Sequence, residues 1–242
     1  MSIRRQLLGT AAIESALKRG EPLQRIVVRR EADGAAVAAL LHRARSAGVP
    51  VHRIGPRDFQ RLRRRGGACD ALGLVGPAPD ADPGEVLRGG GATWHLVGVA
   101  YPGNAGMAIR TAEVSGAGGV FIDSDFDHGA RRAALRASMR ADRFMPVFFG
   151  AAKDVIEKAA AWGRRLVAIE DTGDVPPWDI DLSGRVHFVV GGEARGIPDA
   201  IVAACDAVVR IPTPGFVPSY NLQGAVAAVA SERLRQLEGN PR

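Results

Sequence analysis

The stretch VHFVVGGEARGIP, residues 186–198, decides the fold of this chain. Its first half is almost entirely β-branched or aromatic, without alternation between polar and apolar residues. Such a run is typical of a strand that is buried on both faces of a parallel sheet. Two glycines follow, which allow the backbone to bend sharply or to approach a ligand closely, and Glu193 lies in that bend. Because parallel sheets bind ligands at the carboxyl ends of their strands, the bend predicts a binding site.

Segments of the same kind recur on both sides of this stretch and alternate with helical patterns. Helices are expected over 104–115, 130–140, 151–162 and 222–237, where apolar residues recur at helical spacing. The other predicted strands are WHLVGVA (94–100), GGVFID (118–123), MPVFF (145–149), RLVAIE (165–170) and AVVRIP (207–212). The pattern predicts an α/β domain with a parallel sheet over residues 93–242.

The chain before this domain also alternates between helix and strand, with strand-like segments at LQRIVVRR, VPVHRIG and ALGLVGP. These features predict a small α/β domain over residues 1–80. The stretch APDADPGEVLRGGGA (78–92) is rich in Gly, Pro and Asp and poor in apolar residues, which predicts a linker between the two domains over residues 81–92.

Charge is distributed unevenly between the two parts. Residues 1–92 carry 16 Lys+Arg and 9 Asp+Glu, a net charge of +7, whereas residues 93–242 have a net charge of −1. Arg61, Arg63, Arg64 and Arg65 form a cluster on one predicted short helix. The asymmetry favours a polyanionic partner such as nucleic acid; a solvated basic surface is the alternative.

Composition excludes several classes of protein. No apolar run is long enough to span a membrane, and the N-terminus has no uninterrupted apolar core that would indicate a signal peptide. Cys69 and Cys205 are isolated, with no His at metal-ligand spacing. We therefore expect a reduced, cytoplasmic protein without a metal site.

Two further loops at predicted strand ends carry polar residues. In YPGNAG (101–106), Asn104 is placed to cap the following helix, and Arg110 lies off that helix's apolar stripe, where it is either solvated or binds an anion. In IPTPGFVPSYN (211–221), Ser219 and Asn221 are good N-cap residues for the last helix. The segment GGEARG lacks the spacing of a dinucleotide-binding fingerprint, which argues against a nucleotide-dependent oxidoreductase.

Taken together, NAGMAIRTAEVSGAGGVFI, VVGGEARGIP and IPTPGFVPSYNLQGAVAAVASERL resemble the three ordered motifs of the SpoU (TrmH-like) branch of the SPOUT RNA methyltransferases. The resemblance covers residues 93–242. The predicted N-terminal domain, residues 1–80, is similar to that family's N-terminal RNA-binding domain.

The resemblance implies methyl transfer from S-adenosylmethionine to a ribose 2′-hydroxyl of rRNA or tRNA, by a homodimer whose C-terminal domain contains a trefoil knot. We expect the dimer contact to bury the long apolar face of the predicted helix 222–237. Matching positions imply catalytic roles for Asn104, Arg110, Glu193, Ser219 and Asn221. They imply cofactor binding by Gly191, Gly192, Ile211, Tyr220 and Leu222. The family usually has Leu where Tyr220 stands and a small or acidic residue where Pro218 stands.

A non-catalytic RNA-binding protein on the same fold is the alternative. The complete polar set of the three motifs argues against it, since a decayed enzyme is expected to lose part of that set.

Overall fold

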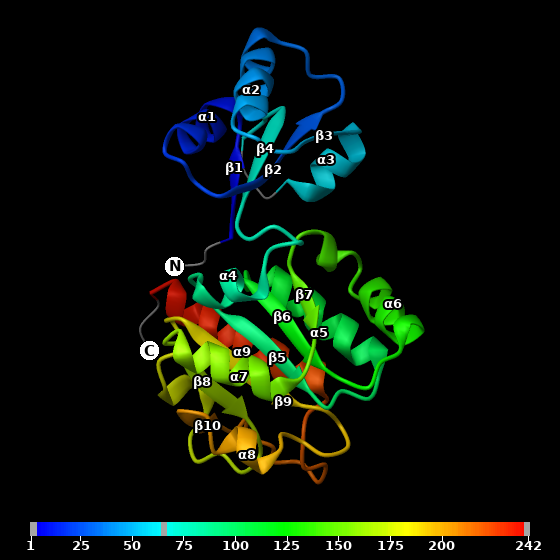
Figure 1. Cartoon of the computed structure of the whole chain (residues 1–242), viewed down its shortest axis with the longest axis vertical. Helices are drawn as coiled ribbons and strands as arrows, with labels where there is room; N and C mark the ends of the chain where they lie inside the picture. The colour runs from blue at the N-terminus through cyan, green and yellow to red at the C-terminus, as the bar shows by residue number, and fades with distance from the viewer. Residues whose placement is uncertain (1–3, 64–66, 240–242) are drawn as a thin grey trace. The chain divides into compact units, whose positions relative to one another are not determined.

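The computed structural model describes residues 4–63 and 67–239, which divide into two compact units. The first unit comprises Arg4–Pro77, and the second begins at Ala78. Each unit has its own sheet and its own hydrophobic core (Figure 1).

The first unit is a four-stranded mixed sheet in the order β1-β4-β2-β3. Strands β2 and β3 are parallel, while β4 runs antiparallel to β1 and β2. Its core contains Ile13, Ile26 and Leu40, with Phe59 buried on α3. The elements are β1 (Arg5–Leu8), α1 (Thr10–Lys18), β2 (Leu23–Arg29), α2 (Ala35–Ser46), β3 (Val51–Ile54), α3 (Pro56–Leu62) and β4 (Ala71–Val75).

The second unit has a six-stranded sheet in the order β10-β8-β9-β5-β6-β7, and all its strand pairings are parallel. The predicted parallel sheet is therefore confirmed. The strands are β5 (Thr93–Val97), β6 (Gly119–Asp123), β7 (Val147–Phe149), β8 (Arg165–Ile169), β9 (Val186–Gly191) and β10 (Ala207–Val209). The helices are α4 (Pro83–Arg88), α5 (Pro102–Val114), α6 (His128–Ala137), α7 (Ala152–Ala161), α8 (Asp199–Val202) and α9 (Leu222–Leu237).

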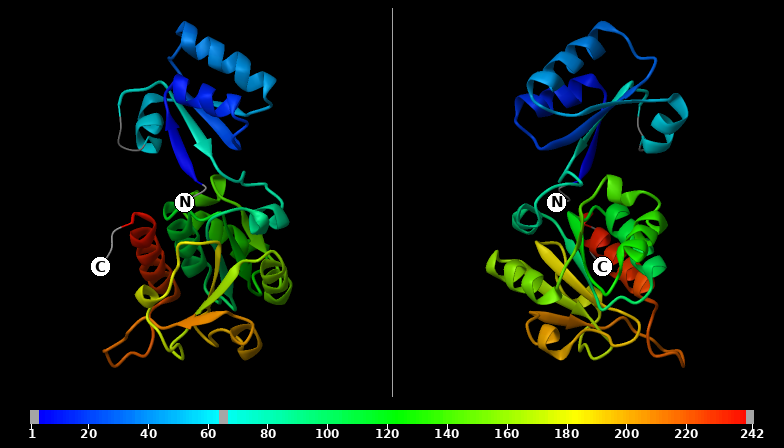
Figure 2. Two further views of the ribbon diagram at one scale, coloured as in Figure 1. Left: turned by 90° about the vertical axis from the view of Figure 1, so that its left-hand side faces the viewer. Right: turned by 45° about the vertical axis from the view of Figure 1, so that its right-hand side comes forward.

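Helices cover both faces of this sheet (Figures 1 and 2). Alternate residues of β5 face opposite sides: Trp94 and Leu96 join the core under α5 and α9, whereas Val97 joins the core under α4 and α7. Apolar burial on both faces explains why the strands read as continuous apolar runs. Strand β5 lies between β6 and β9, so the sheet extends in both directions from the first strand of the unit.

Segment 81–92 is not an extended linker, because it contains α4. Val86 and Leu87 are buried on α7, and Asp82 caps the helix by accepting from Gly84 N at 2.8 Å. The buried guanidinium of Arg164 donates to five backbone carbonyls at 2.6–3.3 Å, those of Val86, Leu87, Gly89, Gly91 and Val186. Two apolar residues among many Gly and Pro gave too weak a pattern for the helix to be predicted.

The connection between the two units is correspondingly short. Pro77 O accepts a hydrogen bond from Gln24 Nε2 at 2.7 Å in the first unit, and Asp82 already caps α4 in the second. Only residues 78–81 separate these two anchored positions.

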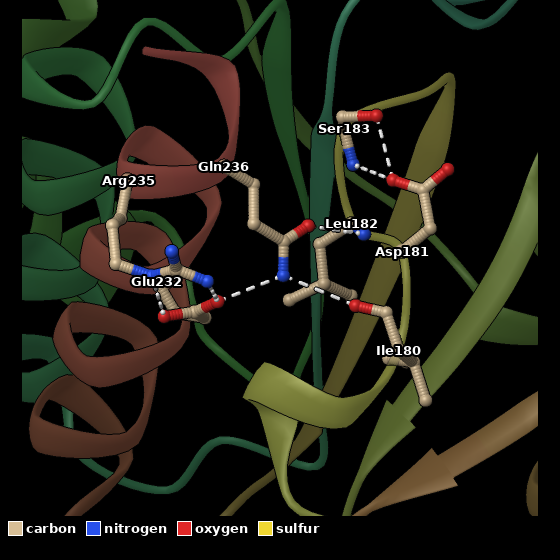
Figure 3. A network of polar contacts seen from close by, with 7 residues as sticks. All are labelled: Ile180, Asp181, Leu182, Ser183, Glu232, Arg235 and Gln236. Atoms are coloured by element: carbon tan, nitrogen blue, oxygen red, sulfur yellow. Dashed lines mark hydrogen bonds and ion pairs between the residues drawn. The ribbon is translucent and has the colours of Figure 1, made fainter. Parts of the chain in front are cut away.

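The last helix, α9, is fixed to the loop before β9 through its C-terminal turns (Figure 3). Gln236 accepts from Leu182 N at 2.7 Å and donates to Ile180 O at 3.0 Å and to Glu232 at 2.8 Å. Arg233 donates to Leu182 O. The helix therefore belongs to the core of the second unit: Leu222, Val226, Val229 and Ala230 are buried within it. The apolar face that we expected to mediate dimerisation is occupied inside its own chain.

Two buried histidines on adjacent central strands predict an acid-sensitive fold. His187 Nδ1 lies 2.8 Å from Thr93 Oγ1, and His187 Nε2 lies 3.3 Å from His95 Nδ1. Burial lowers the pKa of His95 to about 3 and that of His187 well below its usual value of 6.5. Protonation therefore favours the unfolded chain, and the free energy of unfolding should fall as pH drops through 6.5 towards 3. Between pH 7.5 and 5.5 we expect a loss of about 1.4 kcal/mol for each histidine, measured by urea denaturation.

The pH range above 5.5 is chosen because most carboxylates stay ionised there. The His95→Leu variant should lose less stability over this range than the wild type, whereas His42→Ala, which removes an exposed histidine, should follow the wild type. Equal pH slopes for all three proteins would contradict the assignment to the buried pair.

Candidate functional site

A cavity of about 650 Å³ lies in the second unit, at the carboxyl edge of the sheet. It is formed by the loop after β8, the loop after β9, and the loop that precedes α9. Its lining includes Glu170, Asp171, Thr172, Val190, Gly191, Gly192, Glu193, Arg195, Gly196, Ile197, Asp199, Ile211, Thr213, Pro218, Ser219, Tyr220, Asn221, Leu222 and Ala225. Every residue predicted to bind cofactor, namely Gly191, Gly192, Ile211, Tyr220 and Leu222, is among them.

The glycines after β9 are required because the chain doubles back on itself there. A Cβ atom at Gly191 would lie 2.3 Å from the carbonyl carbon of Gly196, and one at Gly192 would lie 2.0 Å from Gly98 O. Gly196 itself has a left-handed φ of +61°. A side chain at Gly191 would therefore collide with the loop's own backbone and distort the cavity wall.

Asn104 and Glu193, which belong to different motifs, meet beside this loop. Asn104 Nδ2 donates to Glu193 Oε1, and Ala100 N donates to Glu193 Oε2 at 3.4 Å. We expected Asn104 to be the N-cap of α5. The helix instead begins at Pro102, and Tyr101 is its N-cap. The pair fixes the position of one carboxylate at the cavity wall.

The polar residues at the start of α9 have distinct roles. Asn221 is the N-cap, and its side-chain oxygen accepts from Gln223 N at 3.0 Å. Ser219 lines the cavity and forms no hydrogen bond with the described part of the chain. Tyr220 also lines the cavity and is 53% exposed. Capping therefore explains Asn221 but leaves the Ser219 hydroxyl available to a ligand.

Arg110 lies apart from the cavity lining. It is exposed on α5, and within residues 4–63 and 67–239 it has neither an ion pair nor a hydrogen-bonded side chain. On an α-helix it lies about 1.7 turns beyond Asn104 and therefore about 120° away from it around the axis. A single chain thus brings together four of the five predicted catalytic residues and leaves Arg110 on its surface.

The loop after β8 is a part of the site that the sequence analysis missed. Glu170 lies directly after the buried strand, and its Oε1 accepts from Ile197 N, so it supports the loop after β9. The rule that ligands bind at carboxyl strand ends could have selected it. Four carboxylates, those of Glu170, Asp171, Glu193 and Asp199, line the cavity with a single cation, Arg195. This charge distribution suits a ligand that carries positive charge.

The predicted basic cluster of the first unit does not lie on one helix. Helix α3 ends at Leu62, so it contains Arg61 but not Arg63, which adopts an extended backbone after it. Arg63 Nη1 donates to Gly67 O at 2.8 Å. Arg64 and Arg65 lie outside the described residues.

A family model, the SpoU rRNA Methylase family, matches residues 93–231, which include the first two motifs, nearly all of the third and the whole cavity lining. The chain belongs to the SpoU rRNA methylase family. The match covers more than half of the chain and lies within the second unit.

Curated relatives and solved structures agree with this assignment. A SpoU relative, 23S rRNA (guanosine-2′-O-)-methyltransferase RlmB of Xylella fastidiosa, is 26% identical over 95% of this chain and 96% of its own length. The S-adenosylmethionine-bound rRNA methyltransferase from Sinorhizobium meliloti superposes with a TM-score of 0.60 at 24% identity, over 97% of this chain and 88% of that one. The SpoU methyltransferase AviRb from Streptomyces viridochromogenes also has a TM-score of 0.60, at 22% identity, covering 98% and 91%.

The described residues add two observations. None of their helices is long and apolar enough to cross a membrane. They also contain no group of three His, Cys, Asp or Glu side chains placed to hold a metal ion.

Proposed function

We propose that this SpoU protein transfers a methyl group from S-adenosylmethionine to a ribose 2′-hydroxyl of rRNA or tRNA in the cytoplasm. The observation that carries the proposal is the convergence of the family's second and third motifs on one cavity, with Asn104 of the first motif bonded to Glu193. The relatives that act on 23S rRNA make this RNA the first substrate to test.

The cavity suits S-adenosylmethionine in size, polarity and charge. Its volume of about 650 Å³ lies within the range of small-molecule sites. Val190, Ile197, Leu222 and Ala225 provide apolar walls for an adenine ring, and the backbone at Gly191 and Gly192 can approach the ligand closely. The carboxylates match the sulfonium and ammonium charges, while Arg195 matches the carboxylate of the methionine part.

The chain's own residues would mainly position and polarise the ribose hydroxyl that accepts the methyl group. S-adenosylmethionine supplies a methyl group that is activated by its positively charged sulfur. The ribose hydroxyl must lose its proton as its oxygen attacks this methyl group, so groups that stabilise the developing alkoxide accelerate the step. Arg110 would bind the adjacent phosphate through its guanidinium and stabilise that charge. The Ser219 hydroxyl and the Asn104–Glu193 pair would orient the substrate.

Arg110 lies outside the lining of the cavity in its own chain. We therefore infer that it acts at the cavity of a second copy of the chain. Apolar side chains flank Arg110 on the same exposed face of α5: Met107 is 41% exposed and Val114 is 66% exposed. Exposed apolar residues at helical spacing mark interaction surfaces. We therefore place the homodimer contact on α5, in place of the apolar face of α9.

Light scattering at micromolar concentration should give about twice the chain mass of 25.5 kDa. Val114→Glu should yield monomers, because it would bury a charge at the contact, whereas Lys158→Glu on α7 should leave the mass unchanged. A wild-type mass of 25.5 kDa would rule out the dimer.

The first unit would dock the RNA. Its excess of positive charge supports this proposal, as does its position before a SpoU domain. Changing Arg61, Arg63, Arg64 and Arg65 to Glu should weaken RNA binding and flatten its dependence on salt by about 0.7–0.9 in log–log slope for each lost phosphate contact. Affinity for S-adenosylmethionine should be unchanged. Arg45→Glu on α2 is the control for overall charge, and an unchanged slope in the four-residue variant would contradict the proposal.

The trefoil knot is also part of the proposal. It is supported by the way in which the chain after β8 is laid against β10: Glu170 N donates to Val209 O at 3.0 Å, and Arg210 N donates to Val175 O at 2.9 Å. A Cβ at Gly173 would lie 2.7 Å from the carbonyl carbon of Val209. Such close passage of two segments is what a knotted crossing requires.

Calorimetric titration with S-adenosylmethionine and with NAD tests the cofactor, and tritiated methyl transfer to transcribed 23S rRNA tests the reaction. We expect S-adenosylmethionine to bind and NAD not to bind. We expect methyl groups to be incorporated into the RNA, but not into RNA that carries a 2′-deoxy residue at the target. Binding of RNA without methyl incorporation under any condition would favour the non-catalytic alternative. Methylation of the 2′-deoxy RNA would point to a base as the acceptor.

A further inference from the structure

The loop between β10 and α9 projects from the second unit as a closed, stiff structure (orange in Figure 2). The Thr213 hydroxyl donates to Pro218 O at 3.3 Å and ties the two ends of the six-residue tip together. Pro212, Pro214 and Pro218 fix backbone φ angles at the tip and just before it. A loop of this kind presents its tip with little further loss of conformational entropy when it binds.

The tip carries two large apolar side chains that are exposed to water. Phe216 has a relative exposure of 108%, and the neighbouring Val217 is 73% exposed. Neither residue contributes to the core of its own unit. Both ends of the tip, Thr213 and Pro218, line the cavity. Phe216 is at most three residues from either, so its backbone lies within about 11 Å of the cavity wall.

The electrostatics of this rim favour a particular kind of contact with RNA. The cavity beside the tip is lined by four carboxylates and one arginine, a combination that disfavours close approach of several phosphates. A nucleobase is neutral, and each of the four bases can stack on an aromatic ring through either of its faces. An exposed phenyl ring on a stiff loop is suited to hold an unstacked base of single-stranded RNA.

We propose that Phe216 is a stacking platform for the nucleobase of the target nucleotide or of its immediate neighbour, and that it thereby positions the ribose at the cavity. The inference rests on the proposed function, because it requires an RNA substrate at this rim. It assigns a positioning role to a residue outside the polar set of the three motifs.

The test compares Phe216→Ala, Phe216→Trp and Phe216→Leu with the wild type, using transcribed 23S rRNA and tritiated S-adenosylmethionine. Stacking of one base is worth about 1–3 kcal/mol, so kcat/KM for RNA should fall about 5- to 150-fold in the Ala variant. Trp should restore it to within about threefold of wild type, and Leu should not, because it is apolar but cannot stack. Affinity for S-adenosylmethionine should be unchanged in all three variants. Val217→Ala, which shortens the other exposed side chain of the tip, should have less than a twofold effect.

A second readout does not depend on turnover. In the Phe216→Trp variant, addition of RNA should quench the fluorescence of the introduced indole, measured as the difference from wild type. Absence of quenching, full activity of the Ala variant, or rescue by Leu equal to that by Trp would each overturn the inference. A halved mass of the Ala variant in light scattering would assign Phe216 to a contact between copies instead. If the wild type transfers no methyl group but quenching occurs, the proposed function fails while the stacking platform stands.

Discussion

Arg110→Ala should reduce single-turnover methyl transfer at least about 100-fold while leaving the affinity for S-adenosylmethionine unchanged. The expected size follows from the proposed role of Arg110, in which its guanidinium stabilises the oxygen that becomes charged during attack. The structure indicates that this variant should lose activity without losing stability. Arg110 is exposed and unpaired within the described part of the chain, so its removal should change the free energy of unfolding by no more than about 0.5 kcal/mol.

Two companion variants sharpen the interpretation of Arg110→Ala. Arg110→Lys should also lose most of the activity, because a point charge cannot reproduce the bidentate guanidinium contact with phosphate. Arg132→Ala, on the exposed surface of α6, should retain full activity. A rate within about threefold of wild type for Arg110→Ala, roughly 0.65 kcal/mol of barrier, would exclude a catalytic role for this side chain.

Arg164→Met should destabilise the second unit by about 3 kcal/mol or more, measured by urea denaturation at pH 7. Met fills similar space but donates no hydrogen bond, so the five carbonyls lose the donor that the buried guanidinium now provides. Of these, Leu87 O and Gly89 O would keep only long hydrogen bonds from Arg185, at 3.4 and 3.3 Å. Each buried carbonyl without a partner costs about 1–3 kcal/mol, less where relaxation admits water. Burial lowers the pKa of Arg164 to about 10, so the guanidinium remains charged at pH 7 and is stabilised by these carbonyls.

The adjacent residue provides a matched control for Arg164. The side chain of Arg165 donates to one carbonyl within the described residues, Asp181 O at 2.7 Å, and this contact is exposed. Arg165→Met should therefore cost less than about 1 kcal/mol. Similar losses for the two variants would show that Arg164 does not hold α4 in place in the manner we describe.

Periodicity and strand-end rules predicted most of the second unit, because its strands are buried on both faces and its longer helices each have an apolar stripe. Helix α9 begins and ends at the predicted residues, Leu222 and Leu237. Strand β1 and helix α8 were missed because each is only four residues long and has too few apolar positions to show a period.

The candidate site was partly predictable for the same reason. The loops after β5 and β9 and before α9 follow or precede strongly patterned elements, and the family's motifs lie in them. Glu170 was missed although it follows β8, because a lone carboxylate at a strand end has no distinctive pattern. The tertiary bond between Asn104 and Glu193 joins positions 89 residues apart and could not be read from local sequence. The packing of α9 on its own core was equally hidden, since helix periodicity does not identify the partner of an apolar face.

The four residues between Pro77 and Asp82 have a consequence for substrate capture. Fully extended, the five Cα–Cα steps from Pro77 to Asp82 span at most about 18 Å, so neither unit can diffuse far from the other. An RNA that is held by the first unit would therefore meet the cavity of the second at an effective concentration in the millimolar range, as short tethers generally provide. A cavity with weak intrinsic affinity for RNA would then suffice for methyl transfer, and a longer connector would dilute the substrate without altering a single contact.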